Sequence, residues 1–141
     1  MKSLSRKSGV VLLFFFAIFV YGEAWGADWK AFGSDSNTVS FYDKENISHS
    51  SNDIVRVSIK VVYTPAGVSD LVHSYGQRYR GLDHKVSLFE LNCKDKMIRL
   101  LSSTWYWADG REITPYSNPN DKWYSIDPES SLDSLRKEVC R

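Results

Sequence analysis

Few side chains in this sequence are arranged for catalysis. The three histidines, His49, His73 and His84, do not have the spacing typical of metal ligands. The hydroxyl run Ser102-Ser103-Thr104 lies in a predicted strand, and no pattern couples it to a histidine. The chain also contains no glycine-rich phosphate loop, no His-Glu-x-x-His motif and no nucleophile elbow. We therefore expect no catalytic residue, no metal, no cofactor and no enzymatic activity.

Three consecutive aromatic residues are better candidates for recognition. Trp105, Tyr106 and Trp107 lie in a predicted strand, where alternation puts the two tryptophans on one face and the tyrosine on the other. One interpretation is packing in the core of the domain. The other is an exposed surface for a protein partner or for a homodimer, because Tyr and Trp are enriched in interfaces.

A basic cluster lies between the predicted helix and the strand that follows it. It contains Arg78, Arg80 and Lys85, together with His84, and Asp83 dilutes its charge. The cluster is either a solvated loop or the charged rim of a surface that binds an acidic partner.

The N-terminus has the pattern of a secretory signal peptide. Lys2, Arg6 and Lys7 precede an uncharged apolar run over residues 10–21. Twelve helical residues reach only ~18 Å, which is well short of a ~30 Å hydrocarbon core. Small residues then predict cleavage before Ala27, with cleavage after Ala24 as the alternative.

This pattern divides the chain into a signal peptide over residues 1–26 and one domain over residues 27–141. We expect an exported protein, in the periplasm, on the outer-membrane surface or outside the cell. We expect no transmembrane segment in its mature form.

Export gives the cysteines a role. Cys93 and Cys140 are the only two, and an oxidising compartment favours pairing them. A bridge across the 46 intervening residues would stabilise the fold by about 4 kcal/mol on the chain-entropy model.

Composition and charge limit the class of protein. Of the 141 residues, 43% are hydrophobic and 25% charged, which is typical of a single globular domain. The first 26 residues hold three basic groups and one acidic group, so the remainder has 15 basic and 16 acidic groups. A domain with nearly equal numbers of basic and acidic groups lacks the positive charge needed to bind nucleic acid, so we expect no nucleic-acid partner.

Hydrophobic periodicity predicts the elements that position these residues. Every second residue from 55 to 63 is apolar, which is typical of a strand with one buried face. Apolar residues at helical spacing over 68–75, followed by Gly76, predict a mid-chain helix. Further strands are expected over 29–32, 39–42, 85–93, 97–107 and 112–114.

A second helix is expected at the C-terminus. Asp127 is its predicted cap, and Leu132, Leu135 and Val139 form its apolar stripe. The fold class is therefore α+β: an antiparallel sheet of about five to six strands with a mid-chain helix and a C-terminal helix packed on it, and one disulfide that clamps the last helix to the sheet.

Several segments of the chain occur in a characteristic order. They are Tyr42-Asp43, Ile54-Val55-Arg56-Val57, Lys60-Val61-Val62-Tyr63, Leu88-Phe89-Glu90-Leu91-Asn92-Cys93, Ile98-Arg99-Leu100-Leu101-Ser102 and Val139-Cys140. In this order and spacing they resemble the surface-adhesin protein E family of exported bacterial proteins, from Trp29 to Cys140. The most specific part is the Glu-Leu-Asn-Cys strand combined with the terminal Val-Cys.

The resemblance implies a small antiparallel sheet with helical cover, an exported chain and a bridge between the two cysteines. It also implies binding of host extracellular-matrix and plasma proteins such as vitronectin and laminin. No binding motif of the family matches positions in this sequence, so the resemblance transfers no binding residues.

Two functions from different classes follow. The first is a non-enzymatic, adhesin-like binding protein whose partner is an extracellular-matrix or envelope protein. The alternative is a small-ligand-binding or enzymatic envelope protein with a pocket under the C-terminal helix, which would require convergent polar groups in a concave site.

Overall fold

A computed structural model describes residues 27–113 and 122–141, so the predicted signal peptide lies outside the described residues. The elements follow one another in this order: β1 (Trp29–Ser34), β2 (Thr38–Asp43), β3 (Ser48–His49), β4 (Ile54–Tyr63), α2 (Pro65–Tyr75), the 3₁₀ turn η1 (Gln77–Tyr79), β5 (Leu82–Asn92), β6 (Met97–Trp107), β7 (Glu112–Ile113), β8 (Tyr124–Ser125) and α3 (Ser131–Val139).

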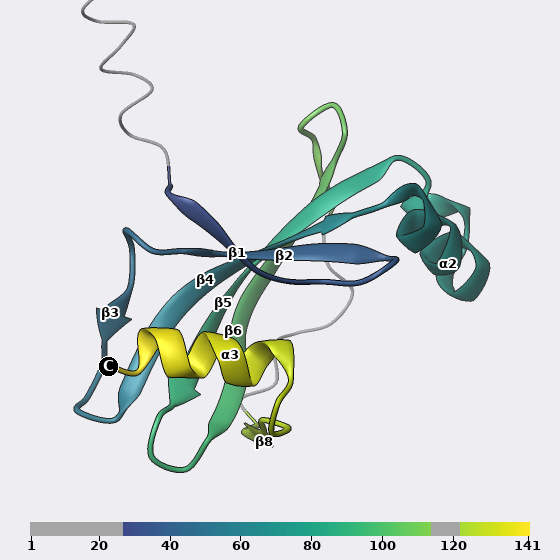
Figure 1. Cartoon of the computed structure of the whole chain (residues 1–141). Coiled ribbons are helices and arrows are strands. Elements are labelled where there is room, and N and C mark those ends of the chain that lie inside the picture. The colour runs from purple at the N-terminus through teal and green to yellow at the C-terminus, as the bar shows by residue number, and fades with distance from the viewer. Residues whose placement is uncertain (1–26, 114–121) are drawn as a thin grey trace, which may run out of the picture.

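All strand pairs in the sheet are antiparallel, and the strand order is β1-β2-β4-β5-β6-β7. The two-residue strands β3 and β8 pair with the beginnings of β4 and β6. Figure 1 shows α3 lying across one face of the sheet and α2 beyond the far end of the strands. This is the α+β architecture that the sequence predicts. We call the face under α3 the inner face and the opposite face the outer face.

Alternation along β4 determines which side chains reach the core. Val55, Val57 and Ile59 are buried on the inner face, at 1%, 0% and 4% exposure, and the residues between them point to the outer face. Leu135 and Val139 of α3 pack against them. The cluster also contains Tyr42, Leu91, Ile98 and Ile126. The contact between α3 and the sheet is therefore filled by apolar side chains.

The disulfide predicted from the sequence is present. Cys93 follows β5 and Cys140 caps the end of α3, and their sulfur atoms are 2.02 Å apart. The bridge therefore fastens the last helix to a central strand. We call the end of the sheet that carries this bridge the disulfide end.

The beginning of α3 differs from the prediction. The helix is capped by Ser130, whose Oγ accepts a hydrogen bond from the backbone N–H of Asp133 at 3.2 Å, so the assignment of Asp127 as the cap is wrong. Glu129 has a φ of 66°, in the left-handed region, and this turn prevents a helix from running through it. Asp127 contributes its carbonyl instead, which accepts from Ser130 Oγ at 2.6 Å.

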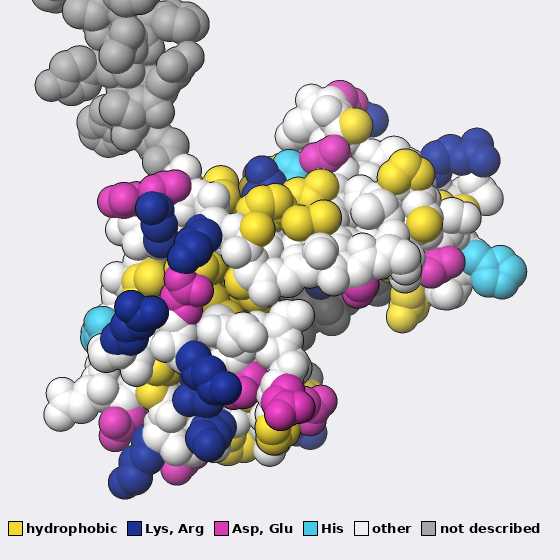
Figure 2. Space-filling view, in the orientation of Figure 1, with side chains coloured by type: hydrophobic (Ala, Val, Ile, Leu, Met, Phe, Trp, Pro, Cys, Tyr) yellow, Lys and Arg dark blue, Asp and Glu magenta, His cyan; other side chains and the backbone are white. Residues whose placement is uncertain are grey.

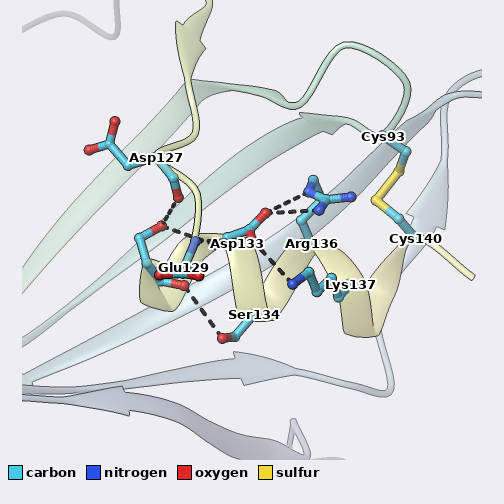
Figure 3. Close-up of polar contacts among 9 residues, drawn as sticks. Cys93, Asp127, Glu129, Asp133, Ser134, Arg136, Lys137 and Cys140 are labelled. Atoms are coloured by element: carbon cyan, nitrogen blue, oxygen red, sulfur yellow. Dashed lines mark hydrogen bonds and ion pairs between the residues drawn. A yellow bond between two sulfur atoms is a disulfide. The ribbon is translucent and has the colours of Figure 1, made fainter.

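Asp133 is a buried acid in the first turn of α3 (Figure 3). Arg136 donates two hydrogen bonds to its Oδ1, at 3.0 and 2.8 Å, and the backbone N–H of Glu129 donates to Oδ2 at 3.2 Å. These bonds lower the pKa of Asp133, and those from Arg136 have the largest effect. Burial acts in the opposite direction but is outweighed. The ionised carboxylate thus holds together the turn at which α3 begins.

Glu90 is a second buried acid, with 2% of its surface exposed. Arg99 donates two hydrogen bonds to Oε1, at 2.8 and 2.6 Å, and Arg56 and Ser50 donate to Oε2 at 3.0 and 3.1 Å. Burial alone would raise the pKa of Glu90, but these donors outweigh it, so the pKa lies below its ordinary value of 4.5. The carboxylate therefore joins β4, β5 and β6 on the outer face of the disulfide end.

Helix α2 begins and ends at residues suited to these positions. Thr64 caps it by accepting from the backbone N–H of Gly67 at 3.1 Å, and Pro65 occupies the first turn. At the other end Gly76 has a φ of 107° and donates its N–H to the carbonyl of Val72 at 2.9 Å. The mid-chain helix is therefore confirmed, with the C-terminal glycine that the sequence predicts.

Thr64 also attaches α2 to the turn between β1 and β2. Its N–H donates to the carbonyl of Asn37 at 2.9 Å, and its Oγ1 donates to that of Ser36 at 2.7 Å. Gly67 lies directly against this turn, because a Cβ built on it would be 2.1 Å from the carbonyl oxygen of Asn37.

Gly67→Ala is therefore expected to destabilise the domain although alanine is the better helix former. The obstructing atom is backbone and cannot rotate away, so the helix must shift from the turn, at a cost of about 1–2 kcal/mol. The free energy of unfolding in urea measures this change, and Ser69→Ala, on the exposed side of the same helix, is the control. A Gly67→Ala protein as stable as the wild type would show that the close contact is not maintained in solution.

Candidate functional site

Trp105 lies at the end of the sheet opposite the disulfide end. Its cross-strand partner is Lys85, which in turn pairs with Val61, so all three side chains lie on the inner face. The Trp105 ring stacks on Tyr63, with centroids 5.9 Å apart, and meets the ring of Tyr79 at 5.7 Å. Trp105 is half-buried in this arrangement.

Tyr79 extends the group of rings to the end of α2. Its ring meets that of Tyr75 edge-on at 6.1 Å, and Tyr75 is 69% exposed. Tyr63, Tyr75, Tyr79 and Trp105 thus form a continuous aromatic cluster from the sheet to the surface of α2. We call this cluster and its surroundings the aromatic end.

Two residues of the basic cluster identified in the sequence contact these rings. The ammonium group of Lys85 lies 5.1 Å from the centroid of Trp105, and the guanidinium carbon of Arg78 lies 5.3 Å from that of Tyr79. Burial lowers the pKa of Lys85. Arg78 and Arg80 are exposed on and after η1. The structure thus brings Arg78, Lys85 and Trp105 together.

Tyr106 and Trp107 are not members of this aromatic cluster. Tyr106 stacks on His84, with centroids 4.7 Å apart, on the outer face. Trp107 ends β6, where the guanidinium carbon of Arg111 lies 5.8 Å from its ring centroid. Tyr106 therefore lies on the opposite face of the sheet from Trp105, because adjacent residues of a strand point in opposite directions.

Apolar and charged side chains gather at different places on the surface. Val62 and Val86 neighbour the Tyr106–His84 pair on the outer face and are half-buried. Figure 2 shows hydrophobic side chains gathered over the middle strands above β2, whereas charged side chains surround α3.

The hydroxyl run of β6 has no catalytic geometry. Ser103 bonds to Ser87, with the two Oγ atoms 2.8 Å apart, on the inner face. His84 lies on the other face of the sheet and contacts Asp83 at 2.6 Å. Over residues 27–113 and 122–141, no group of three or more His, Cys, Asp or Glu side chains could hold a metal ion.

The partners of Trp105 were not predicted from the sequence. The sequence predicts Tyr63 on the buried face of its strand and Tyr75 on the buried face of its helix, but Tyr75 is 69% exposed, so the prediction for Tyr75 is wrong. They meet near Trp105 because β4 leads directly into α2, which turns back across the end of the sheet. Spacing in the sequence carries no signal of this long-range contact.

These features define a small disulfide-bonded α+β domain with a cluster of aromatic and basic residues at one end of its sheet. The chain belongs to the surface-adhesin protein E family, whose model matches residues 29–141. This membership supports an adhesin-like role.

Solved structures of similar fold include two of Haemophilus influenzae protein E. Crystal form II has a TM-score of 0.53 and 16% identity, over 77% of this chain and 91% of that one. The selenomethionine form has the same TM-score and identity, over 82% of this chain and 92% of that one. At this identity the likeness establishes the fold. A search of curated protein sequences found no match.

Membership of this family also indicates where in or outside the cell the protein is located. A surface-adhesin family implies an exported or surface protein. None of the helices in the described part of the chain is both long and apolar enough to cross a membrane.

Proposed function

We propose that this chain is an exported, non-enzymatic adhesin that contacts a protein partner through its aromatic end. Residues 1–26 are its secretory signal peptide, and its partner is an extracellular-matrix or envelope protein. The observation that carries the proposal is the aromatic cluster, in which Trp105 is flanked by Lys85 and joined through Tyr79 to the exposed ring of Tyr75. Aromatic anchors with nearby cations are typical of binding hot spots.

The charge of this surface suggests an acidic partner. Arg78 and Arg80 are exposed beside Tyr79, and Lys85 lies over Trp105. Exposed charges at a rim mainly steer association, whereas the aromatic rings contribute most of the affinity.

Trp105→Ala is expected to weaken binding to immobilised vitronectin or laminin by about 2 kcal/mol or more. Surface plasmon resonance of the exported protein measures this change. Tyr75→Ala removes an exposed ring of the same cluster without a cost in core packing, and is expected to weaken binding as well. Joint replacement of Arg78 and Arg80 by alanine should slow association and reduce its salt dependence.

Tyr124→Ala is the matched control, because Tyr124 is also exposed, at 53%, but lies on β8 at the disulfide end. Thermal unfolding checks that each variant is folded. If Trp105→Ala and Tyr75→Ala both bind as tightly as Tyr124→Ala, the aromatic end is not the contact surface.

A further inference from the structure

A cavity of about 330 Å³ lies between the β1–β2 turn and helix α2. Asp35 and Asn37 of the turn line one side, Asp70 and Ser74 of α2 line the other, and the rings of Tyr63 and Tyr75 are also part of its wall. This volume is at the small end of the range typical of small-molecule sites, about 300–1,000 Å³. The cavity shares the rings of Tyr63 and Tyr75 with the proposed adhesive contact, but its polar groups take no part in that contact.

Direct bonds connect the two sides of the cavity. Asn37 Nδ2 donates to Asp70 Oδ2 at 2.9 Å across it. Beside it, Thr64 bonds to the carbonyls of Ser36 and Asn37, and Gly67 packs on the turn. The site is therefore formed before any ligand arrives, which lowers the entropic cost of binding.

The lining carries negative charge and no positive charge. Of the described residues that line the cavity, two are aspartates and none is Lys, Arg or His. Asp35 Oδ1 accepts from the backbone N–H groups of Asn37 and Thr38, at 2.8 Å each, and these bonds lower the pKa of Asp35. Burial raises the pKa of Tyr63 to about 12, so its hydroxyl stays neutral. An anion would therefore be repelled, and a cation attracted.

The remaining acceptors suit an ammonium group. Asp35 Oδ2 and Asp70 Oδ1 receive no hydrogen bond from the described residues. The aromatic rings of Tyr63 and Tyr75 and the side chain of Leu71 offer apolar contact and, in the case of the rings, attraction for a cation.

We propose that this cavity binds a primary ammonium group on a short aliphatic chain, with the charge between Asp35 and Asp70 and the chain against Tyr63, Tyr75 and Leu71. A free aliphatic diamine and a lysine side chain of a protein both present this group. The site shares the rings of Tyr63 and Tyr75 with the aromatic cluster, but its carboxylates, Asp35 and Asp70, belong to the cavity alone. Loss of amine binding in Asp70→Asn therefore tests the cavity without testing the proposed adhesive contact.

A titration of the ¹⁵N-labelled exported protein with cadaverine, followed by NMR, tests the proposal. We expect saturable shifts of the backbone amides of Asn37, Gly67 and Ser74, with weaker binding at higher salt. Asp70→Asn keeps the size of the side chain and should weaken binding about threefold to fivefold. Asp53→Asn, which removes one carboxylate at the opposite end of β4, should bind as the wild type does.

Two further comparisons are needed. One distinguishes a lysine side chain from a free amine, and the other distinguishes recognition of the ammonium group from non-specific binding. A lysine peptide that binds where its acetyl-lysine counterpart does not would identify a partner's side chain as a source, whereas binding of cadaverine alone would identify a free amine. Pentanol or glucose that shifts the same amides as strongly as cadaverine would overturn the proposal. So would an Asp70→Asn protein that binds cadaverine as tightly as the wild type.

Discussion

Cys140→Ala is expected to lower the free energy of unfolding by about 4 kcal/mol. The bridge joins residues 47 positions apart, so its loss restores much of the conformational freedom of the unfolded chain. Because the bridge holds the end of α3, that helix should separate from the sheet before the central strands do.

Denaturant unfolding measures the loss, and hydrogen exchange locates it. Amides of α3 should lose protection while those of β4 and β5 retain most of theirs. Cys93→Ala and the double variant should behave as the single variant does, since each removes the same bond. Ser134→Ala, an exposed change in α3, is the control. Uniform loss of protection across the sheet would contradict a clamp that acts mainly on the helix.

Glu90→Gln is expected to cost about 2–3 kcal/mol of stability at neutral pH. The amide keeps the shape of the side chain but removes the charge that faces Arg56 and Arg99. Both arginines would then lie beside a buried neutral group. Glu45→Gln, an exposed substitution that also removes one carboxylate, should be nearly neutral.

The same carboxylate predicts a dependence on pH. Because the pKa of Glu90 is lowered in the folded state, its contribution is fully present above pH 4.5 and is lost as the pH falls through the lower folded value. The melting temperature of the wild type should therefore fall more steeply below pH 4.5 than that of Glu90→Gln. Parallel curves for the two proteins would show that folding does not lower the pKa of Glu90.

Much of the fold was predictable because it depends on local patterns. The alternation from residue 55 to residue 63 identified β4, and helical spacing followed by Gly76 identified α2. Pairing of Cys93 with Cys140 followed from export and from their number. Each of these signals arises within one element or from a count, so it does not require the tertiary structure.

Other features depend on contacts between distant segments. Asp127 has the right residue type for a cap, but the left-handed turn at Glu129 moves the start of the helix to Ser131. The cavity requires Asn37 to meet Asp70 across 33 positions of sequence. Trp105 was identified as a candidate, but its neighbours depend on how α2 turns across the sheet. No spacing rule contains this information.

The stabilising contacts and the proposed binding surfaces occupy opposite ends of the sheet. The disulfide and the buried carboxylates of Glu90 and Asp133 lie at one end, and the aromatic cluster and the cavity lie at the other. Substitutions of exposed residues that change recognition therefore fall far from the disulfide and from the two buried carboxylates. Natural selection can alter what such a domain binds, one residue at a time, while the scaffold stays intact. Divergence of ligands among proteins of this architecture is the expected evolutionary outcome.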